Sequence, residues 1–366
     1  MVKSMNNIKK VIASLITITF INAPAVCETI GCNDYVIVSD SVNYRLSPSI
    51  EGYKLGSTDN ETTTQRILET DQFDLVLIDN NWVFVNHDYV KTIGNADGNI
   101  NLIENNDIVK TTVDNLNIRL YPLEDSKSIA KLYKGTECIV YAENDDWYLV
   151  ETDGKIGFIK KEYTISLKEI VRDSYPELLD IEVYKICYTK EDTILDINGE
   201  VKIIDKNTVV KVLKEENDNY LCYTDSGVGY INKNSLEKLD GTFVVVDISS
   251  QSIVLYYNND MILNSACTTG KDSTPTTLGK YGIRYKETNH DFKDYGVSSN
   301  YWMPFNGGEG FHDATWQSRS FGGSTYKKHG SHGCVRLPLE TAERLYNLVT
   351  SKKKDSTNYT DVIIQK

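Results

Sequence analysis

Short runs of alternating apolar and polar residues dominate the chain from about residue 33 to about residue 238. In the stretch IVYAENDDWYLVETDGKIGFI, residues 139–159, three such runs are separated by Asn-Asp-Asp and by Asp-Gly. Alternation with a period of two is typical of β-strands with one buried face, and these polar groups are typical of the tight turns between strands. The pattern therefore predicts small antiparallel β units in this region.

The same short patterns recur along this region. VNYRLSP at 42–48 and LNIRLYP at 116–122 share the pattern N-x-R-L-x-P. ENDDWYLVETDGKIGFIKK at 143–161 resembles ENDNYLCYTDSGVGYINK at 216–233, and DNNWVFVNHDYV at 79–90 is a third relative. Because self-similarity indicates tandem copies of one structural unit, we predict three modules, of which the third lacks the opening N-x-R. Their predicted bounds are 33–92, 111–165 and 180–238.

The pattern of apolar and polar residues changes at residue 241. Alternating segments with tight turns predict further strands, and DVIIQK near the C-terminus predicts a last one. LPLETAERLYNLV carries a helical period, with Ala342 and Leu345 on one face and Pro338 just before it, where a helix start tolerates proline. We therefore predict a β-rich domain at 241–366 with one or two helices, and a short helix in the linker at 165–180. The chain as a whole is predicted to be mainly β.

Composition narrows the classes of function. The 366 residues carry a formal net charge of −13, and 24 tyrosines supply much of the hydrophobic fraction of 40%. Because no basic stripe is available to neutralise phosphates, the charge argues against a nucleic-acid partner. The tyrosine content supports β structure over helix.

The first 27 residues have the order of a secretory signal peptide. Lys3, Lys9 and Lys10 precede an uncharged, mostly apolar run, and the small residues APA follow, ending at Ala25. Because the apolar run is shorter than the roughly 20 residues that a membrane span needs, we predict cleavage of segment 1–27 and no stable membrane span afterwards. A retained anchor and a lipid attachment at Cys27 are the alternatives. The chain is thus expected to be exported, to the extracellular face of the membrane or the cell wall of a bacterium.

The cysteines do not form a disulfide framework, because they are scattered and odd in number. Cys138, Cys187 and Cys222 stand in apolar, strand-like stretches and are expected to be small buried hydrophobes. Cys334 needs a separate explanation. The seven cysteines are Cys27, Cys32, Cys138, Cys187, Cys222, Cys267 and Cys334.

Cys334 lies in the stretch HGSHGCVRLP, where imidazole and guanidinium groups are close in sequence. If SHGCVR is extended, His332, Cys334 and Arg336 point to one face, because side chains alternate along a strand. Gly333 lets another group approach the backbone closely. Such an electropositive pocket favours the thiolate form of a cysteine. His312, upstream, is the candidate partner for this thiol.

Three explanations of Cys334 compete: a metal site, a disulfide and a catalytic nucleophile. His312, His329, His332 and Cys334 offer four zinc ligands, but two of them are only two residues apart, which suits a strand face better than the usual ligand spacing. A disulfide needs Cys267, the other cysteine of the same predicted domain. The nucleophile is the interpretation that we favour.

Region 241–366 resembles the catalytic domain of L,D-transpeptidases of the YkuD type. That family carries a histidine followed by S/T-H-G-C-x-N/R, and here His312 is followed by SHGCVR at 331–336. TTGKDSTPTTLGKYGI at 268–283 and YWMPFNGGEGFHDATW at 301–316 resemble two further stretches of the family. The repeats at 33–238 resemble bacterial SH3-type domains, small β-barrels that bind cell-wall peptide or act as spacers.

The resemblance implies a role for each residue of the motif. Cys334 would attack the carbonyl of a donor peptide and form a thioester, and His312 would deprotonate it and later activate the incoming amine. The main-chain carbonyl of Asp313 would orient the imidazole, and the N–H groups of Gly333 and Cys334 would stabilise the oxyanion. The other expected supporting residues are Ser331, His332 and Arg336. The expected walls of the substrate groove are Tyr301, Trp302, Met303 and Trp316.

The resemblance also implies the partners. Peptidoglycan stem peptides would be the substrates, carbapenem β-lactams would acylate the enzyme, and no metal or organic cofactor would be required. Two alternatives stay open. Water in place of the amine would make the enzyme an L,D-carboxypeptidase, and a vestigial catalytic domain would leave a cell-wall-binding protein.

Overall fold

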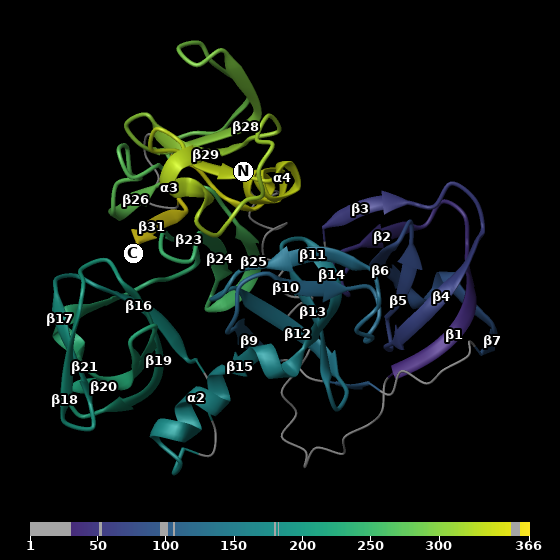
Figure 1. The fold of residues 1–366 in the computed structure, drawn as a ribbon, viewed down its shortest axis with the longest axis horizontal. Helices are drawn as coiled ribbons and strands as arrows, with labels where there is room; N and C mark the ends of the chain where they lie inside the picture. Colours follow the sequence, from purple (N-terminus) through teal and green to yellow (C-terminus); the bar gives the residue numbers. More distant parts are fainter. Residues whose placement is uncertain are drawn as a thin grey trace. The chain divides into compact units, whose positions relative to one another are not determined.

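The computed structural model describes residues 31–50, 53–95, 102–104, 107–178, 181, 183–352 and 359–366 (Figure 1). The predicted signal peptide, with Cys27, lies outside these residues. The chain divides into two compact units: the first ends at Thr164, and the second runs from Ile165 to Lys366 and takes in the short segment Tyr133–Glu137. No helix in the described part of the chain combines the length and the apolar character that crossing a membrane requires. The mainly β fold that the sequence predicts is confirmed.

The first unit contains two modules with the same strand order. Module 1 is hydrogen-bonded in the order β3-β2-β6-β5-β4-β1-β7, and module 2 in the order β11-β10-β14-β13-β12-β9-β15, with β8 added beside β12. Module 1 comprises β1 (Gly31–Val38), β2 (Asn43–Arg45), β3 (Lys54–Ser57), β4 (Thr62–Glu69), β5 (Phe73–Ile78), β6 (Asn81–Asn86), the 3-10 turn η1 (His87–Tyr89) and β7 (Val90–Asn95). Module 2 comprises β8 (Ile103–Glu104), β9 (Ile108–Thr111), β10 (Leu116–Arg119), β11 (Ser128–Leu132), β12 (Glu137–Glu143), β13 (Trp147–Thr152), β14 (Lys155–Lys160), η2 (Lys161–Tyr163) and β15 (Thr164–Ser166).

The tryptophans of this unit belong to its core. Trp82 is 1% exposed, and its indole Nε1 donates a hydrogen bond of 2.6 Å to the Leu120 carbonyl of the next module. Its ring meets Tyr121 edge-on, with the centroids 5.8 Å apart. Trp147 is buried as well. An aromatic side chain with a buried, satisfied N–H contributes packing and orientation, so these rings tie the two modules together.

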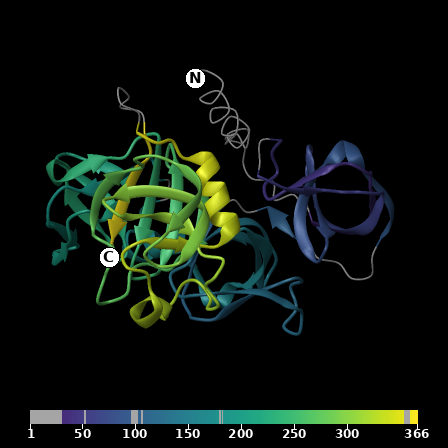
Figure 2. The same ribbon diagram turned by 90° about the horizontal axis from the view of Figure 1, so that it is seen from above.

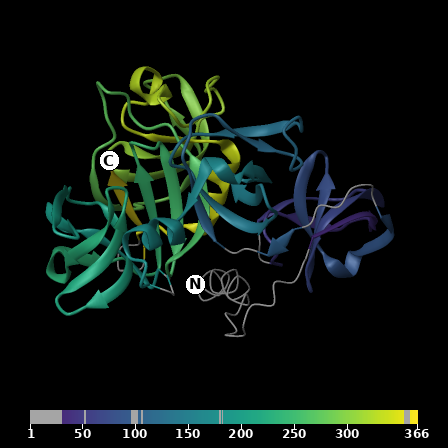
Figure 3. The same ribbon diagram turned by 60° about the horizontal axis from the view of Figure 1, so that its bottom comes forward.

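Module 3 repeats the strand order in the second unit, as β18-β17-β21-β20-β19-β16-β22. The predicted linker helix is present as α2 (Leu167–Ser174), which begins with a capping box between Ser166 and Glu169 and packs Val171 against the module (Figure 3). Module 3 comprises β16 (Lys185–Thr189), β17 (Thr193–Ile197), β18 (Glu200–Ile204), β19 (Val209–Glu216), β20 (Asn219–Thr224), β21 (Gly227–Asn232), η3 (Lys233–Ser235) and β22 (Leu236–Lys238).

The C-terminal domain packs two sheets around one hydrophobic core. One sheet has the order β25-β24-β23-β31-β26 and the other β27-β28-β29-β30. The predicted helix is confirmed as α4 (Leu339–Leu348), capped by Pro338, and its Ala342 and Leu345 are fully buried in the core beside the sheets (Figure 2). The other elements are β23 (Thr242–Asp247), β24 (Ser252–Tyr257), β25 (Asp260–Ala266), β26 (Gly279–Gly282), β27 (Glu287–Phe292), β28 (Val297–Asn306), β29 (Glu309–Asp313), α3 (Thr325–His329), β30 (Val335–Leu337) and β31 (Asp361–Gln365).

No disulfide involves any of Cys138, Cys187, Cys222, Cys267 and Cys334. Cys138, Cys187 and Cys222 are buried, in agreement with the prediction that they pack as small hydrophobes. Cys267 is buried too, and neither it nor Cys334 is in a disulfide, so the alternative of a disulfide between these two residues is wrong.

Candidate active site

Cys334 lies in the loop between α3 and β30. Backbone hydrogen bonds to Thr268 and Thr269 hold this loop in place. Thr268 and Arg336 exchange two backbone hydrogen bonds, each of 2.9 Å. The Ser331 N–H donates to the Thr269 carbonyl at 3.0 Å. The TTGK stretch singled out in the sequence is therefore the support of the thiol loop, because it pairs with residues on both sides of Cys334.

Ser331 fixes the shape of this loop. Its buried hydroxyl accepts a hydrogen bond of 3.0 Å from the Gly333 N–H and donates one to the Cys334 carbonyl. The Gly333 N–H is thereby occupied. In this arrangement the hydrogen of the Gly333 N–H points at Ser331 Oγ, and its role in stabilising an oxyanion stays a prediction.

A glycine is required at position 333 by both the backbone conformation and the atoms that surround it. Its φ angle of 121° is one that residues with side chains rarely adopt, and a Cβ atom built there would lie 2.8 Å from Glu309 Oε1. The Gly333 carbonyl accepts a hydrogen bond of 2.8 Å from Thr276 Oγ1. The group that approaches the glycine closely, as predicted in general terms, is thus the Glu309 carboxylate.

Gly333→Ala is expected to damage the site through this contact. The strained φ costs about 1–3 kcal/mol, and the new methyl group pushes against Glu309. We expect a lower melting temperature and slower acylation by a carbapenem, measured by calorimetry and intact-mass spectrometry. Gly308→Ala is the matched control, because a Cβ there meets no atom within 4 Å. Equal behaviour of the two variants would contradict this account.

His312 lies beside the thiol loop on a neighbouring strand. β29 and β30 pair in parallel, with His312 opposite Arg336. Cys334 precedes Arg336 by two residues, which puts it on the same face of an extended chain. His312 Nδ1 lies 2.9 Å from the Asp313 carbonyl. A carbonyl only accepts, so Nδ1 carries the proton and Nε2 is left as the acceptor.

Burial keeps both groups neutral. Desolvation lowers the pKa of His312 to about 4, with Arg336 lowering it further and the Asp313 carbonyl opposing the shift. Desolvation also raises the pKa of the Cys334 thiol to about 11, with the Glu309 carboxylate adding to the rise and the Gly310 N–H opposing it. The thiol donates to the Gly308 carbonyl at 3.5 Å. In this structure the imidazole and the thiol are therefore both neutral at physiological pH, in contrast to the resting thiolate that the sequence suggested.

Alkylation by iodoacetamide reports this protonation state. Because only the thiolate reacts, the rate at Cys334 is expected to rise about tenfold per pH unit from about pH 7 to about pH 10, with no plateau below the thiol pKa of about 11. Glu309→Gln removes the neighbouring negative charge and is expected to speed the reaction at each pH, measured by peptide mass spectrometry. A plateau near neutral pH would show a resting thiolate instead.

Aromatic rings surround the imidazole of His312. Trp316 stacks on it with the centroids 5.7 Å apart and the planes at 17°, and Phe292 lies at 4.8 Å. Trp302 is opposite His312 in the β28–β29 pairing, with a ring distance of 6.0 Å. Two of the predicted groove residues, Trp302 and Trp316, therefore lie around the candidate base.

The other two predicted groove residues point away from His312. Met303 is fully buried in the domain core, and Tyr301 packs against Tyr346 of α4 with the centroids 5.2 Å apart. Since side chains alternate along β28, residues on either side of Trp302 face the opposite surface. The prediction that Tyr301 and Met303 wall the groove is therefore wrong.

His332 faces a different part of the site from His312. Its ring stacks on Tyr295 at 4.8 Å, and its Nε2 lies 3.4 Å from Lys271 Nζ. Tyr295 lies in the turn of the β27–β28 hairpin, which Figure 1 shows as a long projection of this domain. The two imidazoles have separate partners, which is not the convergence of ligand atoms that a zinc site needs.

Arg336 carries an unsatisfied group. Its Nη1 donates to the His329 carbonyl at 3.3 Å, while its Nε is buried without a hydrogen-bond partner among the described residues. Desolvation lowers the pKa of this guanidinium. Buried donors without partners are rare and costly.

Several residues of the site were not predicted from the sequence. Glu309 is the first residue of β29, directly after a glycine-rich turn, and Phe292 and Tyr295 come from the β27–β28 hairpin. Lys271 follows the supporting loop. These residues lie between 20 and 70 positions from Cys334, and only the alternation along β27 offered a signal, since it puts His290 and Phe292 on one face.

The fold places His312 of β29 beside the cysteine-bearing loop that leads into the parallel strand β30. Residues 241–364 match the L,D-transpeptidase catalytic domain family (YkuD), and residues 114–165 match the bacterial SH3 domain family. Through this domain the chain belongs to the L,D-transpeptidase family.

Solved structures that are similar to the chain are also described as L,D-transpeptidases. The catalytic domain of an L,D-transpeptidase from E. faecium is 30% identical over 34% of this chain and 98% of that chain, with a TM-score of 0.29. The same domain acylated by ertapenem gives the same values. An L,D-transpeptidase from Stackebrandtia nassauensis is 28% identical over 35% of this chain, with a TM-score of 0.30, and this chain covers only 56% of that one. A comparison with curated proteins returned no similar sequence.

Proposed function

We propose that this enzyme cross-links peptidoglycan stem peptides, with Cys334 as the nucleophile and His312 as the general base. The observation that carries the proposal is the pairing of β29 with β30, which brings His312 beside Arg336, two residues from the thiol. The bond from His312 Nδ1 to the Asp313 carbonyl supports the base role, because it leaves Nε2 to accept a proton.

In the first half-reaction a tetrapeptide stem is the acyl donor. His312 Nε2 takes the thiol proton as Cys334 Sγ bonds to the carbonyl carbon of the third residue. The carbon–nitrogen bond to the terminal D-amino acid then breaks, and the leaving amine takes the proton from His312. The donor peptide remains on the enzyme as a thioester, so one difficult acyl transfer is divided into two easier ones.

In the second half-reaction the side-chain amine of another stem attacks the thioester carbonyl. His312 takes a proton from this amine, the carbon–sulfur bond breaks, and the proton returns to Sγ. A neutral imidazole suits this step, and the low pKa of His312, about 4, keeps the ring neutral at physiological pH. The enzyme is restored and the two stems are joined by a new amide.

Arg336 is proposed to bind a carboxylate of the donor. Its buried Nε has no partner among the described residues, and a guanidinium that pairs with a carboxylate gains charge-assisted hydrogen bonds. His332, Ser331 and Gly333 would shape the loop around the acyl group. Trp302 and Trp316 would shield the reaction from water on the side of the base.

The modules are proposed to serve the enzyme outside the membrane. Residues 1–27 would direct export, and the SH3-like modules would bind cell-wall peptide or act as spacers that bring the catalytic domain to its substrate. The acidic chain, with a net charge of −13, is compatible with a peptide substrate and not with nucleic acid.

Incubation with purified muropeptides tests the proposal. We expect a cross-linked dimer and free terminal D-amino acid, detected by liquid chromatography with mass spectrometry. A trimmed monomer without dimer would replace the amine acceptor with water and make the enzyme an L,D-carboxypeptidase. Unchanged tetrapeptide that nonetheless binds the chain would overturn the catalytic proposal in favour of a binding protein.

A further inference from the structure

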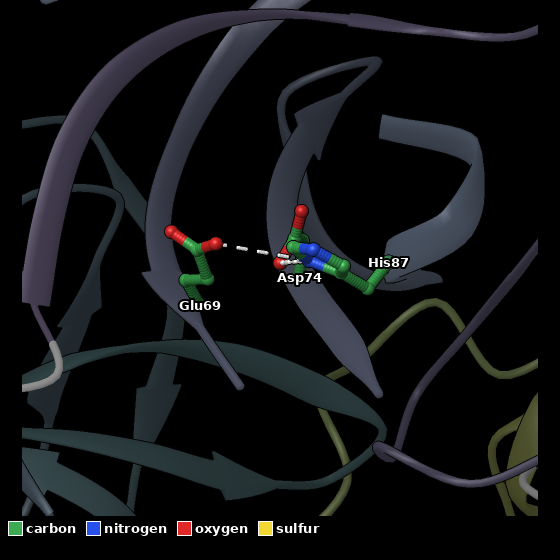
Figure 4. A group of neighbouring side chains, drawn as sticks. All are labelled: Glu69, Asp74 and His87. Carbon is green, nitrogen blue, oxygen red and sulfur yellow. Dashed lines mark hydrogen bonds and ion pairs between the residues drawn. The ribbon is translucent and has the colours of Figure 1, made fainter. Parts of the chain in front are cut away.

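Module 1 contains a group of potential metal ligands that the catalytic function does not use. Glu69, Asp74 and His87 each offer one ligand atom, and these atoms lie within 4.8 Å of one another (Figure 4). His87 Nδ1 is 3.0 Å from Asp74 Oδ1 and 3.8 Å from Glu69 Oε1. The three ligand atoms thus lie close enough together for one cation to contact all of them after small side-chain movements.

Regular backbone structure holds these three residues in place. Glu69 ends β4 and is paired across the ladder with Asp74 of β5. His87 opens η1 directly after β6, and its N–H donates to the Gln72 carbonyl at 2.9 Å. Ligands on strands and capped turns are held more accurately than ligands on loops, so the arrangement is preorganised.

Modules 2 and 3 show what the same positions contain elsewhere. In module 2, Glu143 pairs with Tyr148 across the equivalent ladder, and Lys161 opens η2. Lys161 Nζ bonds Glu143 at 2.9 Å and lies 4.9 Å from the Tyr148 ring. In module 2 these positions therefore carry an ion pair that lies over an aromatic ring.

Module 3 repeats the arrangement of module 2. Glu215 pairs with Tyr220, and Lys233 opens η3. Lys233 Nζ is 2.6 Å from Glu215 and 5.1 Å from the Tyr220 ring. Among these described repeats, only module 1 has an imidazole where modules 2 and 3 have the lysine ammonium group, and a carboxylate where they have the tyrosine phenol. Both differences introduce metal-ligating atoms.

A guanidinium orients the two carboxylates of module 1. Arg66 bonds Glu69 Oε2 at 2.9 Å and Asp74 Oδ2 at 3.1 Å, so the other oxygen of each carboxylate is turned to His87. The positions equivalent to Arg66 are Val140 and Val212, by the same bulged pairing. Groups that hydrogen-bond a ligating carboxylate fix its direction, which is the usual task of the surroundings of a metal.

We propose that Glu69, Asp74 and His87 bind a divalent transition-metal cation, with zinc as the reference ion. In a tetrahedral zinc site with bonds of about 2.1 Å, ligand atoms are about 3.4 Å apart, and the two distances from His87 Nδ1 lie on either side of this value. Arg66 supplies one positive charge against Glu69, Asp74 and the adjacent Asp34, which it also bonds at 2.7 Å. A dication balances the remaining negative charge, and water completes the coordination.

Competition with a chromophoric zinc chelator on the full chain tests the site. The parent carries Cys334→Ser, so that the reactive thiol does not bind metal. At about pH 8, where imidazole is deprotonated, His87→Lys is expected to lose one equivalent of tightly bound zinc relative to this parent. His87 and Glu69 have side chains 39% and 44% exposed, and lysine is the residue of modules 2 and 3, so the fold tolerates the change. Glu69→Gln is expected to weaken the same equivalent at least tenfold.

The matched control is His290→Ala. His290 Nδ1 also lies 3.1 Å from a carboxylate, Glu287, but it lacks the second carboxylate, so zinc binding is expected to stay at the parental stoichiometry. Equal stoichiometry in the parent and His87→Lys would overturn the proposal, as would a parent that binds no zinc. Displacement of the zinc by millimolar calcium would also overturn it, because a nitrogen-containing site disfavours calcium and a simple acidic cluster does not.

Discussion

The Cys334→Ala variant is expected to gain no mass when it is incubated with ertapenem, whereas the parent gains one covalent adduct. The sulfur is the atom that would open the β-lactam ring, and alanine offers no nucleophile in its place. Ertapenem is a carbapenem, the class of β-lactam that the resemblance to the family implies as an acylating inhibitor. Muropeptide turnover is expected to fall by at least about a thousandfold.

Cys267→Ala is the control for this experiment. Cys267 is a fully buried thiol of the same domain. Its N–H donates to the Gln251 carbonyl, and its carbonyl accepts from the Gly322 N–H. Its removal costs packing and is expected to lower the melting temperature while leaving the adduct in place. An adduct that persists on Cys334→Ala, or one that disappears from a folded Cys267→Ala, would assign the nucleophile to another residue.

Local sequence patterns predicted those parts of the molecule that depend on neighbours along the chain. The alternation around Trp147 gave strands, and the period of Ala342 and Leu345 gave α4, because each depends only on which side of an element is buried. The recurrence of N-x-R-L-x-P predicted tandem modules, and the strand order repeats through all of them. The proximity of His312 to the thiol loop followed from the resemblance of the motif to a family.

Properties that depend on burial could not be predicted in this way. The histidine and arginine near Cys334 suggested a thiolate, but desolvation by the folded domain outweighs those charges and raises the pKa of the thiol to about 11. Glu309, whose charge works in the same direction, is brought to Gly333 only by the β28–β29 turn. Protonation states of this kind follow from the packing and not from the motif.

The side to which a residue points was equally hard to predict. The stretch YWMP was expected to present three consecutive groove residues, yet a strand turns Trp302 towards His312 and its neighbours Tyr301 and Met303 into the core. Likewise, the divergence of module 1 emerges only when the paired strands put Glu69, Asp74 and His87 in register with Glu143, Tyr148 and Lys161. The relevant comparison is between positions in a ladder, and the ladder is a tertiary feature.

His312→Gln is expected to slow acylation of Cys334 by about 10²–10⁴-fold near neutral pH. The thiol, with a pKa of about 11, supplies almost no thiolate there, so the reaction depends on a base that takes the proton during attack. Glutamine keeps a donor for the Asp313 carbonyl, which His312 Nδ1 contacts at 2.9 Å. This choice limits the damage to the buried pocket.

The pH dependence distinguishes loss of a base from general damage. The parent is expected to acylate at a nearly constant rate above the His312 pKa of about 4, because the imidazole is neutral and competent throughout that range. The variant is expected to regain activity about tenfold per pH unit as pH rises towards the pKa of the thiol, since the thiolate then forms without help. Cys267→Ala, which removes a buried thiol that takes no part in the proposed reaction, is expected to keep the parental profile. A His312→Gln variant that is slow at every pH by the same factor would remove His312 from the role of base. If only the base is missing, ionisation of the thiol at high pH restores the rate, whereas general damage to the site slows the reaction equally at every pH.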